Sequence, residues 1–288
     1  MTRLSVLGMG RIGGEVAYLA ALLGLADELV VHDIAEEFLH AQVLDLRHAA
    51  TGVDVSTDSA DIPASDIAVV AAGTPRNPGI RSRADLLEAN FPAMKACVHL
   101  LDGFRGVVIA VSNPVDANTH LLHRMLGCER SRVIGFGGQL DSARFSLLLA
   151  GSGIEENGVV LGEHGDHQVP LFHRLETTVD IPLRERMLAQ LRTSSMEVIR
   201  GKGGTVFGPA AHIADLIEAV ATDRREVIPC SCVLDGEYGL SECAMGVPAR
   251  VGSEGVLSVE EWELDGWERA RMDEAAAFLG DLCGRFDV

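Results

Sequence analysis

Short hydrophobic runs alternate with amphipathic stretches along the first half of the chain. The run at 66–73, DIAVVAAG, is apolar almost throughout, as expected for a strand buried on both faces. Strands are predicted at 3–8, 28–33, 66–73, 106–114 and 132–138. Helices are predicted at 11–24, 35–50 and 86–104, and Pro92 is expected to distort the last of them. This alternation indicates β-α-β units and a parallel sheet with right-handed crossovers.

The pattern changes near residue 140. The second half contains GVVLGEHG at 158–165, predicted helices at 183–200, 205–222 and 264–283, and a strand-rich run at 225–260. We therefore predict an α/β protein with a Rossmann-type, doubly wound parallel sheet, followed by an α+β substrate or catalytic domain. The predicted domains are residues 1–138 and 139–288.

Composition narrows the choice of partners and compartment. The 288 residues are 47% hydrophobic, which is sufficient for a sizeable core. The net charge is −18, with Lys95 and Lys202 as the two lysines, so no basic patch favours nucleic acid. Adaptation to high salt and biased base composition both produce such an acid excess. Because neither a signal-peptide pattern nor a run of roughly 18 apolar residues occurs, we expect a cytoplasmic protein without a membrane partner.

The six cysteines are scattered and form no C-x-x-C motif. Cys230 and Cys232 are two apart and would lie on one face of a strand, where disulfides do not form easily. Free, mostly buried thiols are therefore predicted.

A glycine-rich turn, GMGRIG at 8–13, ends the first predicted strand and opens a predicted helix. Gly8 would turn the chain, Gly10 would let the backbone approach a pyrophosphate, and Gly13 would allow close helix–strand packing. The helix N-terminus then faces the phosphates with partial positive charge. Asp33 follows Gly13 by twenty positions and can accept hydrogen bonds from ribose hydroxyls, while repelling a 2′-phosphate. This pattern favours NAD over NADP.

Two polar segments near the middle carry candidate catalytic groups. In GFGGQLDSARF, Asp141 and Arg144 are three apart on one helix face, where a plain ion pair is the alternative. In LGEHGDHQVP, His164 and His167 form an H-x-x-H in a glycine-containing turn, without the helical i, i+4 spacing of common zinc pairs. We therefore predict no metal site, but a proton-exchanging histidine held by a carboxylate, for which Asp141 is available.

Taken together, these segments resemble the lactate/malate dehydrogenase family over essentially the whole chain. The resemblance is closest to archaeal-type malate dehydrogenases of lactate-dehydrogenase-like architecture. It is carried by GMGRIG, VVHDI, AAGTPRNPG, SRADLLEAN, VSNPVD, VIGFGGQLDSARF, LGEHGD and, more loosely, GKGGTVFGPA. It implies a homo-oligomer, with a tetramer favoured over a dimer. It gives no role to His167, which we expect to be structural or solvent-facing.

The resemblance also implies roles for individual residues. His164 would exchange the substrate hydroxyl proton, and Asp141 would stabilise its charged form. Arg144 would bind the C1 carboxylate of the substrate in a bidentate manner. The implied substrate-binding residues are Arg76, Arg83, Asn113, Arg144 and Thr205. The cofactor-binding residues expected from the motif and the resemblance are Gly8, Met9, Gly10, Arg11, Ile12, Gly13, Asp33, Asn90, Val111 and Asn113.

The segment at 73–90, GTPRNPGIRSRADLLEAN, would close over bound substrate in the manner of the family. Arg76 matches the position where malate dehydrogenases carry arginine and lactate dehydrogenases carry glutamine, which implies a second substrate carboxylate. The segment is one residue longer than the family spacing Arg-x-Pro-Gly-x-x-Arg. We assign the carbonyl-polarising role to Arg83, with the extra residue in the loop tip, and Arg81 is the alternative.

The resemblance thus implies reversible, NAD-dependent oxidation of (S)-malate to oxaloacetate, with a small dicarboxylate as partner. A dehydrogenase of another 2-hydroxy acid, such as lactate, is the first alternative. A dinucleotide-binding regulatory protein without turnover is the second, although binding alone would need none of His164, Asp141 and Arg144.

Overall fold

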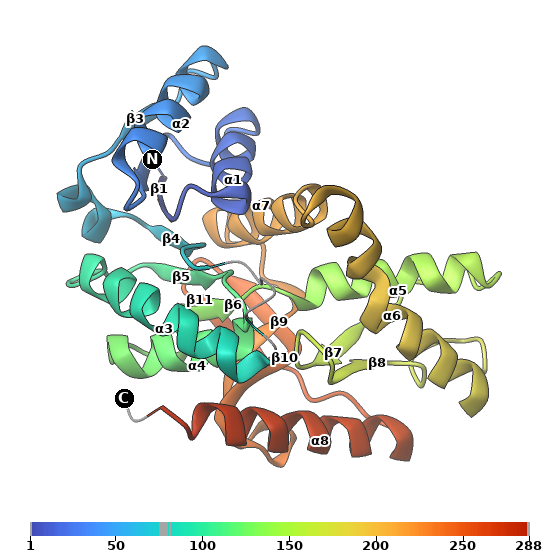
Figure 1. Cartoon of the computed structure of the whole chain (residues 1–288). Coiled ribbons are helices and arrows are strands. Elements are labelled where there is room, and N and C mark those ends of the chain that lie inside the picture. Colours follow the sequence, from blue (N-terminus) through green and yellow to red (C-terminus); the bar gives the residue numbers. More distant parts are fainter. Residues whose placement is uncertain (1, 75–79, 81, 287–288) are drawn as a thin grey trace.

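The first six strands form a parallel, doubly wound sheet. A computed structural model describes residues 2–74, 80 and 82–286 of the chain (Figure 1). The strands are β1 (Arg3–Leu7), β2 (Glu28–His32), β3 (Asp54–Ser56), β4 (Ile67–Val70), β5 (Val107–Ala110) and β6 (Val133–Gly135). The chain runs outward from β1 through β2 and β3 on one side, and through β4, β5 and β6 on the other. This order confirms the predicted Rossmann-type sheet.

The second half extends the same sheet with antiparallel strands. They are β7 (Val160–Gly162), β8 (Gln168–Pro170), β9 (Glu226–Asp235), β10 (Ser241–Gly252) and β11 (Gly255–Val259). β6 pairs antiparallel with β9, with Ile134 opposite Cys232, so the described strands form one 11-stranded sheet. The division after residue 138 stays a prediction, because the sheet runs across it without a break.

Helices cover both faces of the sheet (Figure 1). They are α1 (Arg11–Leu22), α2 (Glu36–His48), α3 (Arg83–Leu100), α4 (Val115–Leu126), α5 (Gly138–Gly151), α6 (Ile181–Lys202), α7 (Phe207–Ala221) and α8 (Gly266–Cys283). Short 3-10 turns lie at Ser59–Ala64, Arg130–Arg132 and Glu237–Gly239. None of the described helices is long and apolar enough to cross a membrane.

Successive residues of the parallel strands alternate between two hydrophobic cores. Leu4 and Val6 of β1 pack in one core with residues of α1, α2 and α7. Leu7 packs in the other core, with residues of α3 and α4. Successive strand side chains point to opposite faces, so burial on both sides requires the unbroken apolar runs seen in the sequence.

Helix α3 begins three residues earlier than predicted, at Arg83, because a capping box forms there. The Ser82 hydroxyl accepts from the Asp85 amide at 3.1 Å, and the Asp85 carboxylate accepts from the Ser82 amide at 3.0 Å. These bonds satisfy backbone donors that a helix start leaves unpaired. The helix then runs through Pro92 as one element.

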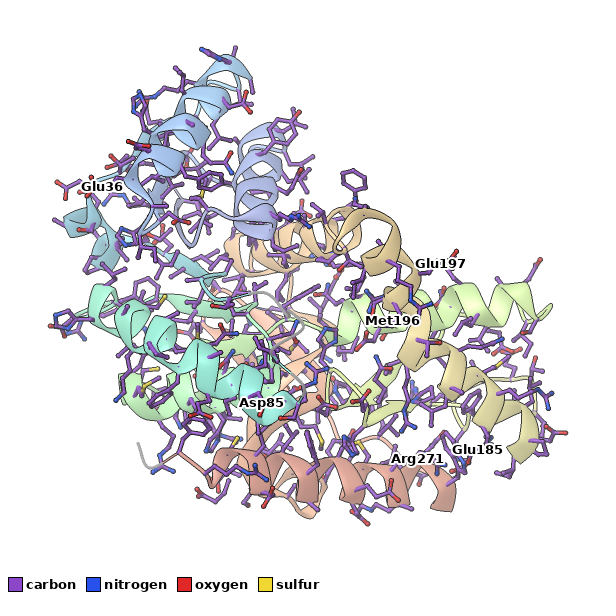
Figure 2. All side chains as sticks on the ribbon, viewed as in Figure 1. Glu36, Asp85, Glu185, Met196, Glu197 and Arg271 are labelled. Atoms are coloured by element: carbon purple, nitrogen blue, oxygen red, sulfur yellow. The ribbon has the colours of Figure 1, made fainter. Side chains whose placement is uncertain are left out.

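An ion pair joins two of the outer helices. Arg271 on α8 and Glu185 on α6 lie side by side in Figure 2, with Nη2 2.5 Å from Oε1, which ties these two helices together.

All six cysteines are free, as predicted. Cys230 and Cys232 lie on β9 with their sulfur atoms 3.7 Å apart, at the distance of a thiol hydrogen bond and not of a disulfide.

Candidate functional site

The turn between β1 and α1 is shaped by what its glycines lack. Gly8 has a φ of +95°, and an added Cβ would lie 2.5 Å from the amide nitrogen of Ala72. A Cβ on Gly13 would lie 1.8 Å from the carbonyl oxygen of Gly8. By contrast, nothing lies within 4 Å of a Cβ built on Gly10 among the described residues. Gly10 caps α1 without a side-chain bond, so the helix N-terminus is open to an anion.

The residues beside these glycines divide into core and surface. Met9 is fully buried, and Ile12 packs against the same core. The side chain of Arg11 crosses to the turn between α6 and α7, where a Cβ on Gly203 would lie 3.0 Å from its Nη1. Gln42 of α2 donates to the Met9 carbonyl at 2.8 Å, which connects the glycine-rich turn to α2.

Asp33 directly follows β2 and lies close to the glycine-rich turn. Its carboxylate accepts the Met9 amide at 2.8 Å and the Ala35 amide at 3.0 Å. Each carboxylate oxygen has two lone pairs, so capacity for ribose hydroxyls is left after these bonds are made. The loop after β2 and the glycine-rich turn therefore meet at this carboxylate.

The loops after β4 and β5 are braced by Asn90. Its Oδ1 accepts the Thr74 amide at 2.6 Å, and its Nδ2 donates to the Asn113 carbonyl at 2.8 Å. The side chain is 2% exposed, so the amide is fully used inside the protein. Val111 is half-buried, and its amide donates to the Val70 carbonyl at 3.0 Å. Asn90 thus links the backbone at Thr74 to the backbone at Asn113, at the carboxyl ends of the parallel strands.

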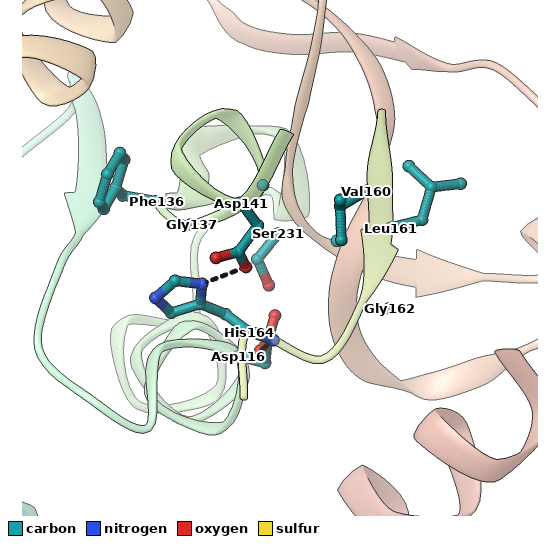
Figure 3. Close-up of a pocket in the computed structure, with 11 residues that line it drawn as sticks. Asp116, Phe136, Gly137, Asp141, Val160, Leu161, Gly162, His164 and Ser231 are labelled. Carbon is teal, nitrogen blue, oxygen red and sulfur yellow. Dashed lines mark hydrogen bonds and ion pairs between the residues drawn. The ribbon is translucent and has the colours of Figure 1, made fainter. Parts of the chain in front are cut away.

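His164 and Asp141 meet between β7 and α5 (Figure 3). Nδ1 of His164 lies 2.6 Å from Oδ2 of Asp141. The Ser142 hydroxyl accepts the Val160 amide at 3.0 Å and thereby fixes α5 against β7. Gly137, with a φ of +157°, leaves room for the imidazole, since a Cβ there would lie 2.7 Å from Cγ of His164.

The pair is arranged to hold opposite charges. Burial lowers the pKa of His164, but attraction to Asp141 and the hydrogen bond between them outweigh burial and raise it. Burial likewise opposes ionisation of Asp141, yet the His164 ring and Arg144 hold its pKa below the usual value. Asp141 also lies in the first turn of α5, where the helix dipole favours an anion.

Arg144 continues the same chain of charges. Its Nη1 lies 3.1 Å from Oδ1 of Asp141, at the i, i+3 spacing expected from the sequence. With a side-chain exposure of 18%, it is sheltered without being sealed off from a ligand. Burial lowers the pKa of His212 on α7; Asp215 acts against this, and the charge of Arg144 adds a smaller lowering. Thr205 is half-buried on the segment between α6 and α7.

Arg83 reaches the site from the first turn of α3. Its Nη2 donates to the His164 carbonyl at 2.8 Å, and its Nη1 donates to Oδ1 of Asn113 at 3.2 Å. Its Nε lies 3.3 Å from Oε1 of Glu163, whose side chain is 2% exposed. These contacts join α3, the loop after β5 and the turn after β7.

Two predicted residues, Arg76 and the alternative Arg81, lie outside the described residues.

His167 lies at the edge of the site, with its ring stacked on Phe278 of α8 at 4.3 Å and its Nδ1 3.4 Å from Oε2 of Glu163. Within the described ranges, no group of three or more His, Cys, Asp or Glu side chains is placed to hold a metal ion.

The structure adds two buried acids to the site. Asp116 of α4 accepts the backbone amide of His164 at 2.8 Å, and Glu163 stands between Arg83 and His167. Both residues belong to segments that the sequence singled out, VSNPVD and LGEHGD. Asp116 is three residues after Asn113, a spacing that places it on the first turn of the following helix, but the helix itself was missed.

Two family models together match nearly the whole chain. Residues 2–135 match the NAD binding domain of the lactate/malate dehydrogenases, and residues 138–282 match their α/β C-terminal domain. The chain belongs to the lactate/malate dehydrogenase family. This membership confirms the resemblance drawn from the motifs and the prediction of NAD as cofactor.

Relatives within the family align over nearly their full length. The chain is 43% identical to a malate dehydrogenase of Halobacterium salinarum, over 97% of each chain. It is 40% identical to a malate dehydrogenase of Haloferax volcanii, over 98% of each chain. A crystal structure of a minor L-lactate dehydrogenase from Enterococcus mundtii superposes with a TM-score of 0.92 at 26% identity, covering 100% of this chain and 99% of that one.

Proposed function

We propose that this protein is an NAD-dependent malate dehydrogenase that interconverts (S)-malate and oxaloacetate. It is an oxidoreductase of the family whose members act on 2-hydroxy acids with NAD. The observation that carries the proposal is the full-length similarity to malate dehydrogenases, at 38% to 43% identity. The contacts among His164, Asp141 and Arg144 support it from the chemistry of the site.

The residues present fit NAD. Gly10 leaves open space at the start of α1, where a pyrophosphate can approach backbone amides, and Asp33 lies at the end of β2 for ribose hydroxyls. We assign the remaining predicted cofactor-binding residues to the same NAD site: Gly8, Met9, Arg11, Ile12, Gly13, Asn90, Val111 and Asn113. When bound, NAD supplies the acceptor for the hydride that leaves C2 of malate.

In this proposal His164 is the acid and base. Its Nδ1 is held by Asp141, so Nε2 is the ring nitrogen available to the substrate hydroxyl. As malate is oxidised, Nε2 accepts the hydroxyl proton, and Asp141 stabilises the imidazolium that results. In the reverse direction the same nitrogen returns the proton to the C2 oxygen.

The arginines hold and polarise the substrate. Arg144 binds the C1 carboxylate with its remaining guanidinium donors, because only Nη1 is engaged by Asp141. Arg83, beside the His164 carbonyl and Asn113, stabilises negative charge that develops on the C2 oxygen. Thr205 and Asn113 complete the walls of the substrate site.

Arg76 is proposed to select the substrate by pairing with its second carboxylate. A substrate with a methyl group there would leave this guanidinium desolvated and unpaired, a difference on the order of 10³-fold. The test is a panel of 2-oxo acids with NADH for the natural enzyme and for Arg76→Gln. Oxaloacetate should be preferred by the natural enzyme, and preference should move toward pyruvate in the variant. A natural enzyme that prefers pyruvate would make the protein a lactate dehydrogenase, and an unchanged oxaloacetate preference in the variant would remove the role of Arg76.

The proposal extends to the setting of the enzyme. We place it in the cytoplasm, in the reaction that oxidises malate in the tricarboxylic acid cycle, as a homo-oligomer with a tetramer favoured over a dimer. The support is its likeness to malate dehydrogenases over the full chain. Sedimentation analysis of the purified protein at low and high salt tests the assembly.

A further inference from the structure

A small cavity is lined in part by the His164–Asp141 pair (Figure 3). Four of its lining groups are polar and belong to separate elements: Asp116 of α4, Asp141 of α5, His164 of the turn after β7, and Ser231 of β9. The remaining walls include Phe136, Val160 and Leu161. The space open to a water-sized sphere is about 10 Å³, close to what one water molecule needs.

Asp116 has no part in the proposed mechanism, yet its burial demands an explanation. Its exposure is 2%, and burying an ionisable carboxyl is costly unless its oxygens are satisfied. Oδ2 accepts the backbone amide of His164 at 2.8 Å. Oδ1 has no hydrogen-bond partner among the described residues, and neither has the buried hydroxyl of Ser231 on the same cavity.

The surroundings of Asp116 couple it to the catalytic histidine. Burial first, and then repulsion from Glu163, raise the pKa of Asp116 to about 6. The Ser231 hydroxyl, which shares the cavity with this carboxyl without meeting hydrogen-bond geometry, and the His164 amide act in the opposite direction. An ionised Asp116 in turn raises the pKa of His164, adding to the larger effect of Asp141. The titratable and polar groups that act on Asp116 from the packed elements are Glu163, His164 and Ser231. Asp116 in turn helps to raise the pKa of the thiols of Cys243 and Cys283, which pack nearby.

We propose that Asp116 is a positioning residue for the reaction, which fixes the main chain of His164 and stabilises its protonated ring. Ser231 completes this site by supplying the Asp116 carboxyl with a polar neighbour across the cavity. The inference rests on the proposed function, because it concerns the histidine that exchanges the substrate proton. Asp116 itself touches neither substrate nor cofactor in this assignment.

The proposal predicts a shift in pH dependence and not a simple loss of rate. Reduction of oxaloacetate needs protonated His164, and oxidation of malate needs the neutral ring. Loss of the Asp116 charge lowers the pKa of His164, so the limb that reports this ring moves to lower pH in both directions. Because the equilibrium constant fixes the ratio of the two directions at each pH, the position of the limb is the readout. Damage to the fold would lower the rate without moving the limb.

The main test is Asp116→Asn, which keeps the shape of the side chain and an acceptor for the His164 amide. We expect the limb of the kcat/KM profile that reports His164 to move down by about one pH unit. Ser231→Ala should move it in the same direction by less, because Asp116 then ionises less readily. Asp166→Asn is the matched control, since Asp166 is an exposed carboxylate two residues from His164 and solvent screens its charge.

Titration of the His164 ring by NMR, in the protein without ligands, gives a second measurement. The pKa of His164 should be highest in the natural protein, lower in Ser231→Ala and lowest in Asp116→Asn. An unchanged titration in a folded Asp116→Asn protein overturns the inference. So does a shift in Asp166→Asn as large as the shift in Asp116→Asn. If the natural protein reduces no 2-oxo acid, the proposed function fails, but this titration still decides whether Asp116 acts on His164.

Discussion

The glycine loop (residues 8–14) and the catalytic turn (residues 163–167, named for the role proposed for His164) are built in opposite ways. The glycine loop depends on missing side chains, because a Cβ on Gly13 would lie 1.8 Å from the Gly8 carbonyl oxygen. The catalytic turn depends on charged side chains around it: Asp141 holds the His164 ring, Asp116 accepts the His164 amide, and Arg83 donates to the His164 carbonyl. One region offers backbone amides to an anion, whereas the other sets the charge of an imidazole.

This difference means that the two regions should fail in different ways. A change in the glycine loop acts through space and is felt in packing and cofactor affinity. A change in the catalytic turn acts through charge and is felt in rate and pH dependence. Variants that separate these readouts test the comparison directly.

The largest effect is expected for Asp141→Asn. The asparagine keeps the shape but removes the charge that holds the pKa of His164 up, so the proton donor for reduction is depleted at neutral pH. We expect kcat/KM for oxaloacetate to fall on the order of 10³-fold, with a profile moved to lower pH. NADH binding, measured by fluorescence titration, should be unchanged. An equal loss of NADH affinity would show that the two regions are not separable.

A smaller, steric effect is expected for alanine at two glycines of the loop. Gly13→Ala forces a collision inside the protein, so the free energy of unfolding should fall by about 1–3 kcal/mol even without cofactor. Gly10→Ala is the matched control, because its new Cβ meets nothing in the described protein. That variant should unfold at the natural temperature, yet bind NADH at least about tenfold more weakly, since its methyl group occupies the approach of the pyrophosphate. Equal thermal stability of the two variants would contradict the assignment.

The parallel sheet was predictable because its signal is local. Strands buried on both faces must be apolar at every position, and runs such as residues 66–73 meet this condition. Helix α4 was missed for the opposite reason. Its sequence is amphipathic, but four of its eight buried positions are polar, namely Asp116, Asn118, Thr119 and His120, so the buried face cannot be recognised from apolar residues alone. The pairing of β6 with β9 was also out of reach, because no local pattern specifies a contact between strands so far apart in the chain.

The site was predictable where a motif fixes a residue, and not where only packing does. The partnership of His164 with Asp141 and the helix-face spacing of Asp141 and Arg144 were expected from the sequence, and the structure brings all three together. The contact of Asp116 with the His164 amide joins α4 to the turn after β7, and such a contact between distant elements leaves no mark in spacing. The same limit applies to Glu163 and its hold on Arg83.

The smallest effect, and the sharpest test of the catalytic turn, is expected for Gly165→Ala. A Cβ on Gly165 would lie 2.1 Å from Nη2 of Arg83 and 2.1 Å from Oε1 of Glu163. Both atoms are ends of flexible side chains, so the fold should survive while Arg83 is pushed from the His164 carbonyl.

For Gly165→Ala, kcat should therefore fall by about tenfold, because a charge that stabilises the transition state is displaced. The His164 limb of the pH profile should move only slightly, to higher pH, because Arg83 lowers the pKa of His164 less than Asp141 and Asp116 raise it, and these two carboxylates are untouched. Gly151→Ala, at the end of α5 with open space around its Cβ, should keep natural activity. If Gly165→Ala also kept the natural rate, Arg83 would not act from the place it occupies beside Glu163, and the carbonyl-polarising role would pass to Arg81.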